Sequence, residues 1–302
     1  MKTVLVTGGA GFIGFHVSKA LLERGDAVVV VDNFNDYYDP KLKHMRIELL
    51  EKYSNLKVYK IDISDNEELD KIFKENKFEK ICHLAAQAGV RHSLNDPFRY
   101  EKWNNLGTLN VLEMAKKYNV KDFVFASSSS VYGDNKKIPF SEDDKVDTPL
   151  SIYAATKKTN ELYAYVYHSL YGLNCTGLRL FTVYGPLGRP DMALFKFVKN
   201  ILEDKPIEVY NNGNMKRDFT YVSDIVQGIL AAIDKPFGYE IINLGNNKPI
   251  ELNKFIEIIE IEIGKKAKKK FLPMQQAEVL VTYANINKAK KLLNYEPHIK
   301  IE

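Results

Sequence analysis

The fold of this chain is decided by the stretch Thr3-Val4-Leu5-Val6-Thr7-Gly8-Gly9-Ala10-Gly11-Phe12-Ile13-Gly14. Its first half has the apolar and β-branched residues of a short buried strand, and its second half opens an amphipathic helix. The glycines fit both G-x-x-G-x-x-G and G-x-G-x-x-G, so the chain can turn tightly while backbone amides approach an anion. We expect a dinucleotide pyrophosphate here, contacted by Gly8, Gly11, Phe12, Ile13 and Gly14; a glycine-rich turn without a ligand is the alternative.

The end of the second apolar strand indicates which dinucleotide binds. Val28-Val29-Val30-Val31 leads into Asp32 and Asn33. A carboxylate at this position accepts hydrogen bonds from the adenosine ribose hydroxyls and repels a 2′-phosphate, which favours NAD over NADP. An isolated Asp32 would be an ordinary solvated acid at a strand end, so the prediction depends on its distance from the glycines.

The alternation of strands and helices predicts an α/β fold with a Rossmann-type, doubly wound parallel sheet. Strands are expected near residues 3–6, 27–31, 57–61, 80–84 and 122–126, with amphipathic helices at 12–24 and 66–75. The residues after the third and fourth strands lie at the carboxyl edge, where the adenine and the middle of the cofactor would sit; they are Asp62, Ile63, Leu84, Ala85 and Ala86. Plain loop and strand-end positions remain the alternative for this group.

The second half of the chain has a less regular pattern and predicts a smaller lobe. A long helical stretch at 151–171 and a strand at 174–180 precede a loop rich in proline and glycine at 184–190. We place an NAD-binding domain at residues 1–180 and a smaller α/β substrate lobe at 181–302. Some segments of that lobe are expected to return to the first sheet.

Composition excludes several classes of protein. The chain is 45% hydrophobic and 27% charged, and its net charge of +4 is too small to indicate nucleic acid. The lysine-rich run 265–270 is expected to be a solvated turn. Cys82 and Cys175 lack metal-ligand or disulfide spacing, and no stretch reaches membrane-spanning length. We expect a soluble, untargeted, cytoplasmic protein without a metal site and without nucleic-acid or membrane partners.

Tyr153 and Lys157 form the candidate catalytic pair. A spacing of four residues puts both side chains on one helix face, but the spacing alone proves little. The same spacing recurs at Tyr37/Lys41, Tyr53/Lys57 and Tyr132/Lys136. The pair at 153 is distinguished by its position, because it follows a strand ending in 127–133 (Ser-Ser-Ser-Ser-Val-Tyr-Gly) and a turn containing Pro149.

That position can bring a hydroxyl, a phenol and an ammonium together beside the nicotinamide. A phenol with a pKa near ~10 is a poor base at neutral pH, and a neighbouring ammonium and cationic nicotinamide would lower that pKa. Tyr153 is then the general base, Lys157 tunes it and holds the ribose, and Ser128 hydrogen-bonds the reacting hydroxyl. A surface helix face beside a polar turn is the alternative.

These residues resemble the extended short-chain dehydrogenase/reductase family over nearly the whole chain. The specific similarity is to UDP-glucuronate 4-epimerases. It is carried by residues 32–38 (Asp-Asn-Phe-Asn-Asp-Tyr-Tyr) with Leu42-Lys43, by 88–91 (Ala-Gly-Val-Arg), and by 183–186 (Val-Tyr-Gly-Pro) followed by 188–195 (Gly-Arg-Pro-Asp-Met-Ala-Leu-Phe). Residues 214–221 (Asn-Met-Lys-Arg-Asp-Phe-Thr-Tyr) resemble the family segment whose arginine meets the diphosphate. Residues 273–279 depart from the family's usual turn near the nucleotide.

The resemblance implies a UDP-sugar substrate and a role for further residues. Arg91 and Arg217 would contact the nucleotide sugar, and Asn104 would contact the cofactor. A 4-keto glucuronate can lose CO2, so an epimerase must hold its carboxylate in an unproductive orientation; the implied clamp is Ser129, Ser130, Thr182 and Arg189. The implied reaction is oxidation at C4, rotation of the keto sugar and return of the hydride to its other face.

The resemblance also separates this chain from related enzymes. The acidic pair of the 4,6-dehydratases is replaced by Ser129 and Ser130, and the glutamate of the UDP-glucuronate decarboxylases is missing from 153–157. A UDP-glucose or UDP-N-acetylglucosamine 4-epimerase remains an alternative, and a catalytically silent NAD-binding sensor or scaffold is a second one. Helical stretches at 98–118 and 151–171 resemble those of the family's four-helix interface, which implies a homodimer.

Overall fold

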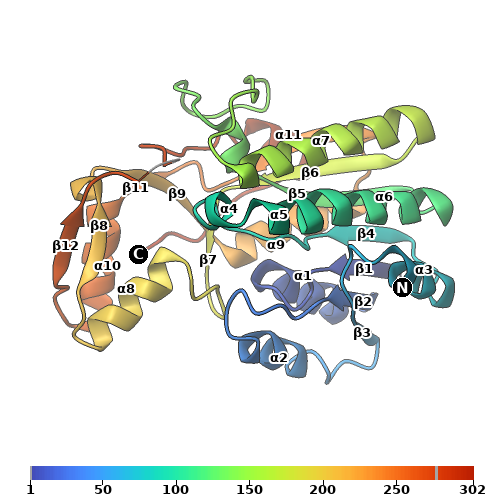
Figure 1. Cartoon of the computed structure of the whole chain (residues 1–302), viewed down its shortest axis with the longest axis horizontal. Helices are drawn as coiled ribbons and strands as arrows, with labels where there is room; N and C mark the ends of the chain where they lie inside the picture. The colour runs from blue at the N-terminus through green and yellow to red at the C-terminus, as the bar shows by residue number, and fades with distance from the viewer. Residues whose placement is uncertain (1, 276–277) are drawn as a thin grey trace.

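The computed structural model describes residues 2–275 and 278–302. Figure 1 shows a large sheet flanked by helices and, beside it, a smaller lobe that contains α8, α10, β8 and β12. The large sheet has seven strands in the order β10-β6-β5-β4-β1-β2-β3, all paired in parallel. These strands are β1 (Thr3–Thr7), β2 (Ala27–Asp32), β3 (Leu56–Lys60), β4 (Lys80–His83), β5 (Asp122–Ser128), β6 (Asn174–Leu180) and β10 (Tyr239–Leu244).

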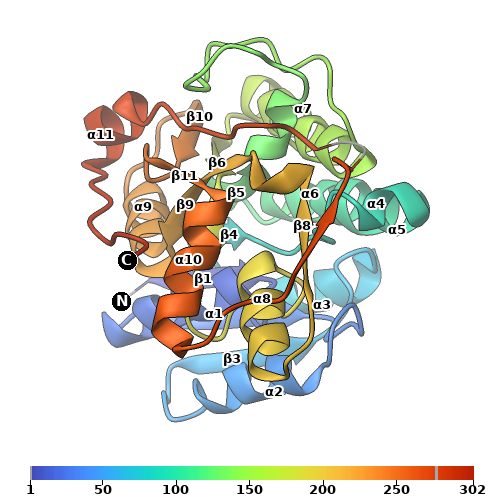
Figure 2. The same cartoon turned by 90° about the vertical axis from the view of Figure 1, so that its left-hand side faces the viewer.

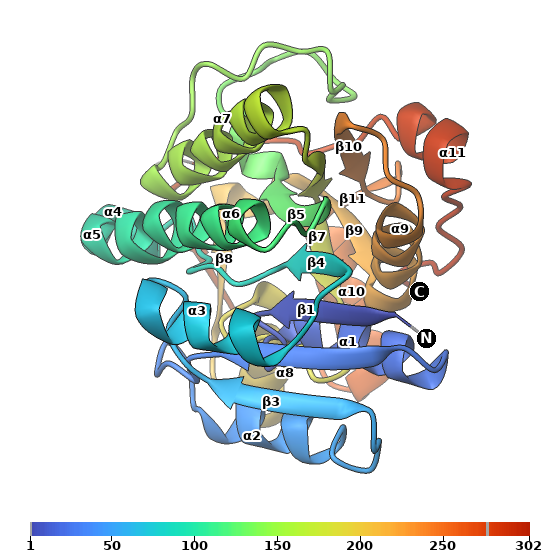
Figure 3. The same ribbon diagram turned by 90° about the vertical axis from the view of Figure 1, so that its right-hand side faces the viewer.

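Helices cover both faces of this sheet, as a doubly wound fold requires. Figure 3 shows α3 (Asn66–Glu75), α6 (Gly107–Lys117) and α7 (Ile152–Tyr171) over one face, with α1 (Phe12–Glu23) and α9 (Val222–Asp234) on the other. A short helix α2 (Lys41–Glu48) follows β2, and α11 (Asn287–Leu293) contacts β10 and α9. The strand order reverses between β1 and β4, which opens a crevice at the carboxyl edge where ligands bind in such sheets.

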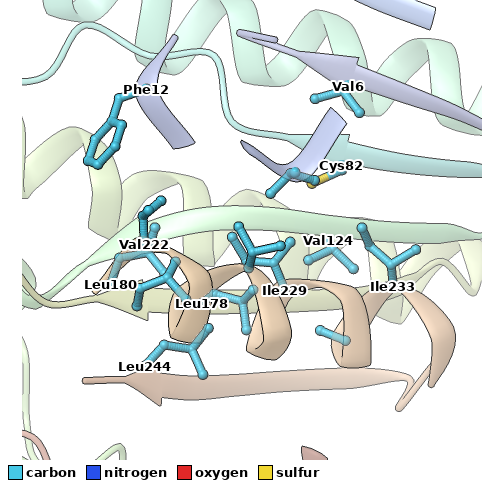
Figure 4. Close-up of a cluster of buried hydrophobic side chains, with 14 of the residues drawn as sticks. Val6, Phe12, Cys82, Val124, Leu178, Leu180, Val222, Ile229, Ile233 and Leu244 are labelled. Carbon is cyan, nitrogen blue, oxygen red and sulfur yellow. The ribbon is translucent and has the colours of Figure 1, made fainter. Parts of the chain in front are cut away.

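The strand β10 and the helix α9 come from the second half of the chain but complete the first sheet. Figure 4 shows the packing: Ile229 and Ile233 of α9 lie against Val124 and Leu178 of the central strands, with Cys82 nearby. All of these side chains are buried. Burial of this apolar surface ties the two halves of the sequence into one core. The division of the chain at residue 181 stays a prediction.

The smaller lobe is built from two short sheets and two helices. One sheet has the order β11-β9-β7, from β11 (Pro249–Glu251), β9 (Lys216–Tyr221) and β7 (Thr182–Tyr184), and the other pairs β12 (Lys269–Leu272) with β8 (Ile207–Tyr210). Figure 2 shows α8 (Ala193–Leu202) and α10 (Leu252–Ile263) on this side of the molecule. Phe219 stacks on Phe255 at 4.4 Å between ring centres, inside a core separate from that of the large sheet.

Several predicted boundaries differ from the observed ones. The stretch 98–118 is one helical run in three parts: α5 (Pro97–Tyr100), a π-helix at Glu101–Leu106, and α6; a one-turn helix α4 (His92–Asn95) precedes it. The run 265–270 is only partly a turn, because β12 begins at Lys269 and pairs with β8. None of the helices in the described part of the chain is both long and apolar enough to span a membrane.

Candidate active site

A cavity of about 460 Å³ lies at the carboxyl edge of the large sheet and reaches the smaller lobe. The ends of β2 and β5, the loops that follow β1, β4 and β6, and the start of α7 all contribute to its wall. Most of the predicted site residues line it: Gly8, Gly11, Phe12, Ile13, Gly14, Asp32, Asn33, Ile63, Leu84, Ala85, Ala86, Ser128, Ser129, Ser130, Tyr153, Lys157, Thr182, Arg189 and Arg217. Asp62, Asn104 and Arg91 are not among the lining residues.

The glycine loop is folded so tightly that side chains are excluded. Gly8 has a φ of +71°, its N–H donates to Val31 O at 2.7 Å, and the Gly11 N–H donates to Gly8 O at 2.9 Å. A Cβ on Gly14 would lie 2.1 Å from Gly8 O, and one on Gly8 would lie 2.7 Å from the Ala85 N. The loop therefore brings backbone close to the cavity at the start of α1, as anion binding requires.

Asp32 is buried at the end of β2 and held in one orientation. One carboxylate oxygen accepts from the Ala10 N–H at 3.2 Å, and the other accepts from the Phe34 N–H at 2.9 Å. Lys43 donates to this second oxygen at 3.1 Å and also lines the cavity. The carboxylate is therefore fixed at the cavity wall before any ribose arrives, which lowers the entropy cost of binding one.

Asp62 and Asn104 lie one contact behind the cavity wall. Asp62 accepts from Trp103 Nε1 at 2.8 Å, and the Trp103 ring lines the cavity. Asn104 is fully buried; its amide accepts from the Gln87 N–H at 2.7 Å and donates to the Gln87 carbonyl at 3.1 Å. In this position Asn104 holds the backbone after β4, and its contact with the cofactor stays a prediction.

Ser128, Tyr153 and Lys157 lie together where β5 meets α7. The Ser128 hydroxyl accepts from the Ser130 N–H at 3.1 Å and so begins a 3₁₀ turn at Ser129–Tyr132. Ser151 caps α7 by accepting from Ala154 N–H at 3.1 Å, which places Tyr153 in the first turn. Lys157, one turn later, donates to the Ala126 carbonyl at 2.7 Å.

The protonation of this group is governed by burial. Burial raises the pKa of Tyr153, while the nearby Ser128 hydroxyl and the Arg189 charge lower it, and the net direction is upward. Burial also lowers the pKa of Lys157 to about 8. Desolvation therefore outweighs the Arg189 charge at Tyr153, and the lowering of its pKa expected from Lys157 together with a cationic nicotinamide stays a prediction.

Arg217 and Arg91 share one carboxylate, that of Glu278. Arg217 donates from Nη2 to Glu278 Oε2 at 2.7 Å, and Arg91 donates from Nη2 to Glu278 Oε1 at 2.7 Å. Arg217 and Glu278 line the cavity, so Arg91 stands one contact behind it. Of the segment 273–279 that departs from the family turn, residues 276 and 277 lie outside the described residues.

Comparison with known proteins identifies the family. The model of the NAD dependent epimerase/dehydratase family matches residues 4–245, most of the chain. The chain belongs to this family.

A UDP-glucuronate 4-epimerase of Thermodesulfobacterium geofontis is 54% identical to this chain, over 100% of this chain and 93% of its own length. The crystal structure of UDP-glucuronic acid 4-epimerase from Bacillus cereus with UDP-glucuronic acid and NAD has a TM-score of 0.92 and 37% identity, covering 99% of this chain and 95% of that one. A UDP-glucose 4-epimerase from Thermotoga maritima, solved with UDP-glucose, has a TM-score of 0.91 and 33% identity over 99% of this chain and 94% of that one.

The family's cofactor, NAD, fits the residues present. The glycine loop leaves no room for a Cβ and would hold the pyrophosphate, and the fixed Asp32 carboxylate would accept from the ribose hydroxyls. Lys157 and Tyr153 line the same cavity and would lie near the nicotinamide. In the described residues, no cluster of three or more His, Cys, Asp or Glu side chains could hold a metal ion.

Several residues of the cavity wall have no role that was predicted from the sequence. Tyr37, Lys43 and Glu278 are three of them with charged or hydrogen-bonding side chains. Tyr37 and Lys43 lie in the segments that carry the family resemblance, so a signal for them was present in the chain. Glu278 carried no such signal. Its role depends on a contact with Arg217 across 61 positions of sequence.

Proposed function

We propose that this protein interconverts UDP-glucuronate and UDP-galacturonate by NAD-dependent epimerisation at C4 of the sugar. The observation that carries the substrate assignment is the half-buried Arg189 guanidinium, which lines the same cavity as Ser128 and Tyr153. Ser129, Ser130 and Thr182 line this cavity too and offer hydroxyl donors to a carboxylate. The 54% identity to a UDP-glucuronate 4-epimerase supports the same assignment.

The reaction needs a base and a fixed sugar. Tyr153 accepts the proton of the C4 hydroxyl, which Ser128 orients by hydrogen bonding. The glycine loop and Asp32 would hold NAD, which would supply the hydride acceptor and donor for C4. Rotation of the 4-keto sugar about its link to the diphosphate presents the other face, and Tyr153 then returns the proton to the C4 oxygen. Lys157 holds the ribose beside this step and supplies positive charge that favours the phenolate.

The test is product analysis. Purified protein with NAD is incubated separately with UDP-glucuronate, UDP-glucose and UDP-N-acetylglucosamine, and products are resolved by chromatography and NMR. Conversion of the glucuronate alone to its C4 epimer supports the proposal. Conversion of a neutral sugar would keep the epimerase chemistry and move the substrate to the UDP-hexoses.

A UDP-hexose substrate is the second candidate, and one contact favours it. Asp191 already accepts two hydrogen bonds from Arg189, at 3.0 and 2.5 Å, and so offsets its charge. A site with less net positive charge has less need of a carboxylate on the sugar. Arg189→Ala would separate the candidates, because it should lower activity on UDP-glucuronate and spare activity on neutral sugars.

We also propose that the protein acts as a homodimer in the cytoplasm. The helix α7 exposes the apolar side chains Leu162, Tyr165 and Leu170, and Phe98 of the neighbouring α5 is 84% exposed. Two such helical runs from each protomer would bury this surface as a four-helix interface. Light scattering should give twice the chain mass, and Leu162→Glu with Leu170→Glu should give the monomer. Both cysteines are free and buried, which suits a reducing compartment.

A further inference from the structure

The Arg189 side chain is held from two directions. Asp191 accepts from its Nε at 3.0 Å and from its Nη2 at 2.5 Å, a bidentate pair in the smaller lobe. Tyr37 reaches this pair from the loop between β2 and α2, on the cofactor side. Its hydroxyl donates to Asp191 Oδ2 at 3.2 Å, and the Arg189 guanidinium carbon lies 5.8 Å from the centre of its ring.

This geometry restricts what Arg189 can offer to a substrate. With Nε and one N–H of Nη2 turned to Asp191, the Nη1 donors remain the main group available to a sugar carboxylate. Arg189 and Asp191 carry charges and Tyr37 is neutral, as these contacts require. Arg189 holds the pKa of Asp191 below its usual value despite burial, and burial together with Asp191 raises the pKa of Tyr37.

We propose that Tyr37 and Asp191 are positioning residues that fix Arg189, and that this fixed arginine keeps the 4-keto sugar from losing CO2. The inference rests on the proposed function, since it concerns a carboxylated sugar. In the 4-keto acid, breaking the C5–C6 bond releases CO2, sends the bonding electron pair toward the C4 carbonyl and requires a proton at C5. This cleavage is fast only when the breaking bond stands perpendicular to the carbonyl plane. A carboxylate held by one rigid donor pair stays out of that orientation.

The hydrogen bond between Tyr37 and Asp191 links the loop after β2 to the proposed sugar site. Tyr37 lies five residues after Asp32, in the segment that begins at the predicted ribose contact, whereas Asp191 lies beside Arg189 in the smaller lobe. A single hydroxyl therefore bridges the two sides of the cavity. Its removal changes the orientation of Arg189 without removing the guanidinium or its charge.

The test measures how turnover divides between two products. Tyr37→Phe, Asp191→Asn and the parent are incubated with NAD and UDP-glucuronate, and the C4 epimer is compared with the decarboxylated UDP-pentose product and released CO2. We expect the decarboxylated share to rise roughly 2- to 10-fold for Tyr37→Phe, which loses one hydrogen bond, and roughly tenfold or more for Asp191→Asn, which loses an ion pair. Tyr53→Phe, whose hydroxyl bonds Glu23, and Asp204→Asn, which pairs with Lys265, are the matched controls.

An unchanged product ratio in a folded Tyr37→Phe variant would overturn the proposal. Folding is checked by melting temperature and by NAD binding, and Tyr37→Phe is the milder variant because it removes only one oxygen. If the parent does not turn over UDP-glucuronate, the proposed function has failed and the positioning role is decided by binding. Calorimetry then compares UDP-glucuronate with UDP-glucose: a ratio of affinities that changes roughly threefold in Tyr37→Phe supports the role, and an unchanged ratio rejects it.

Discussion

Replacing Lys157 by methionine should make this protein more stable while destroying its activity. Lys157 is only 4% exposed, and its ammonium donates a hydrogen bond to Ala126 O at 2.7 Å. Burial lowers its pKa from 10.5 to about 8. At about 1.36 kcal/mol for each pKa unit, the buried charge costs the folded state roughly 3 kcal/mol at pH 7. Loss of the hydrogen bond costs about 1 kcal/mol, which leaves a net gain of roughly 2 kcal/mol.

The stability that Lys157→Met gains over the parent depends on pH. Between about pH 8 and 10.5 the unfolded chain holds the Lys157 proton while the folded protein releases it, so the stability of the parent rises with pH in this window. The penalty is complete below about pH 8 and is absent above about pH 10.5. Lys157→Met should therefore melt roughly 4 °C above the parent at pH 7. The difference should vanish near about pH 10 and reverse above it, where only the loss of the hydrogen bond remains.

Thermal melts of both proteins, free of nucleotide, at pH 7, 8.5 and 10 test this reasoning. Lys196→Met, at an exposed position in α8, is the control and should stay within about 0.5 kcal/mol of the parent. Epimerase activity of Lys157→Met should fall by roughly 100-fold or more. The inference that the Lys157 ammonium is desolvated would be refuted if Lys157→Met melted below the parent at pH 7, or if the difference in melting temperature did not change with pH.

Three further outcomes follow from the site and the fold. Tyr153→Phe should lower turnover by roughly 100-fold or more while NAD affinity, measured by calorimetry, stays within about threefold, since only the proton acceptor is lost. Gly14→Ala should abolish NAD binding in a fluorescence titration, because its Cβ would lie 2.1 Å from Gly8 O. Asp218→Ala should lower the free energy of unfolding by about 3 kcal/mol or more in urea denaturation, because its buried carboxylate accepts from the N–H groups of Asn246, Asn247 and Ala284, which would lose their partner.

Features that depend on near neighbours in the chain were predictable from the sequence. The glycine turn, the strand that ends on Asp32 and the helix that carries Tyr153 and Lys157 are each set by local pattern, and parallel pairing then brings their carboxyl ends to one edge. The pair at 153 was separable from other Tyr-x-x-x-Lys spacings only by its position after β5. The Tyr132 hydroxyl, from one of those other pairs, donates instead to Asn243.

Features that depend on distant partners were not predictable. The amide of Asn104 is used on the Gln87 backbone, and Arg91 stands behind Glu278 rather than at the wall. Both residues are polar and close to the cavity, so pattern alone cannot distinguish contact from support. The Tyr153 pKa is a further case, because its direction depends on how completely the fold buries the phenol.

The two ends of the proposed substrate site pair their arginines with carboxylates in different ways. A guanidinium that is partly withdrawn from water gains from a carboxylate partner, and Arg189 and Arg217 are both largely covered and both paired. At the end where we propose that the diphosphate binds, Glu278 is shared between Arg91 and Arg217, and a bound diphosphate would compete with that carboxylate for the same donors. At the proposed sugar end Asp191 pairs with one arginine, Arg189, and also accepts a hydrogen bond from the Tyr37 hydroxyl. The first arrangement favours exchange of partners and so affects affinity, whereas the second resists exchange and so governs the orientation in which the sugar reacts.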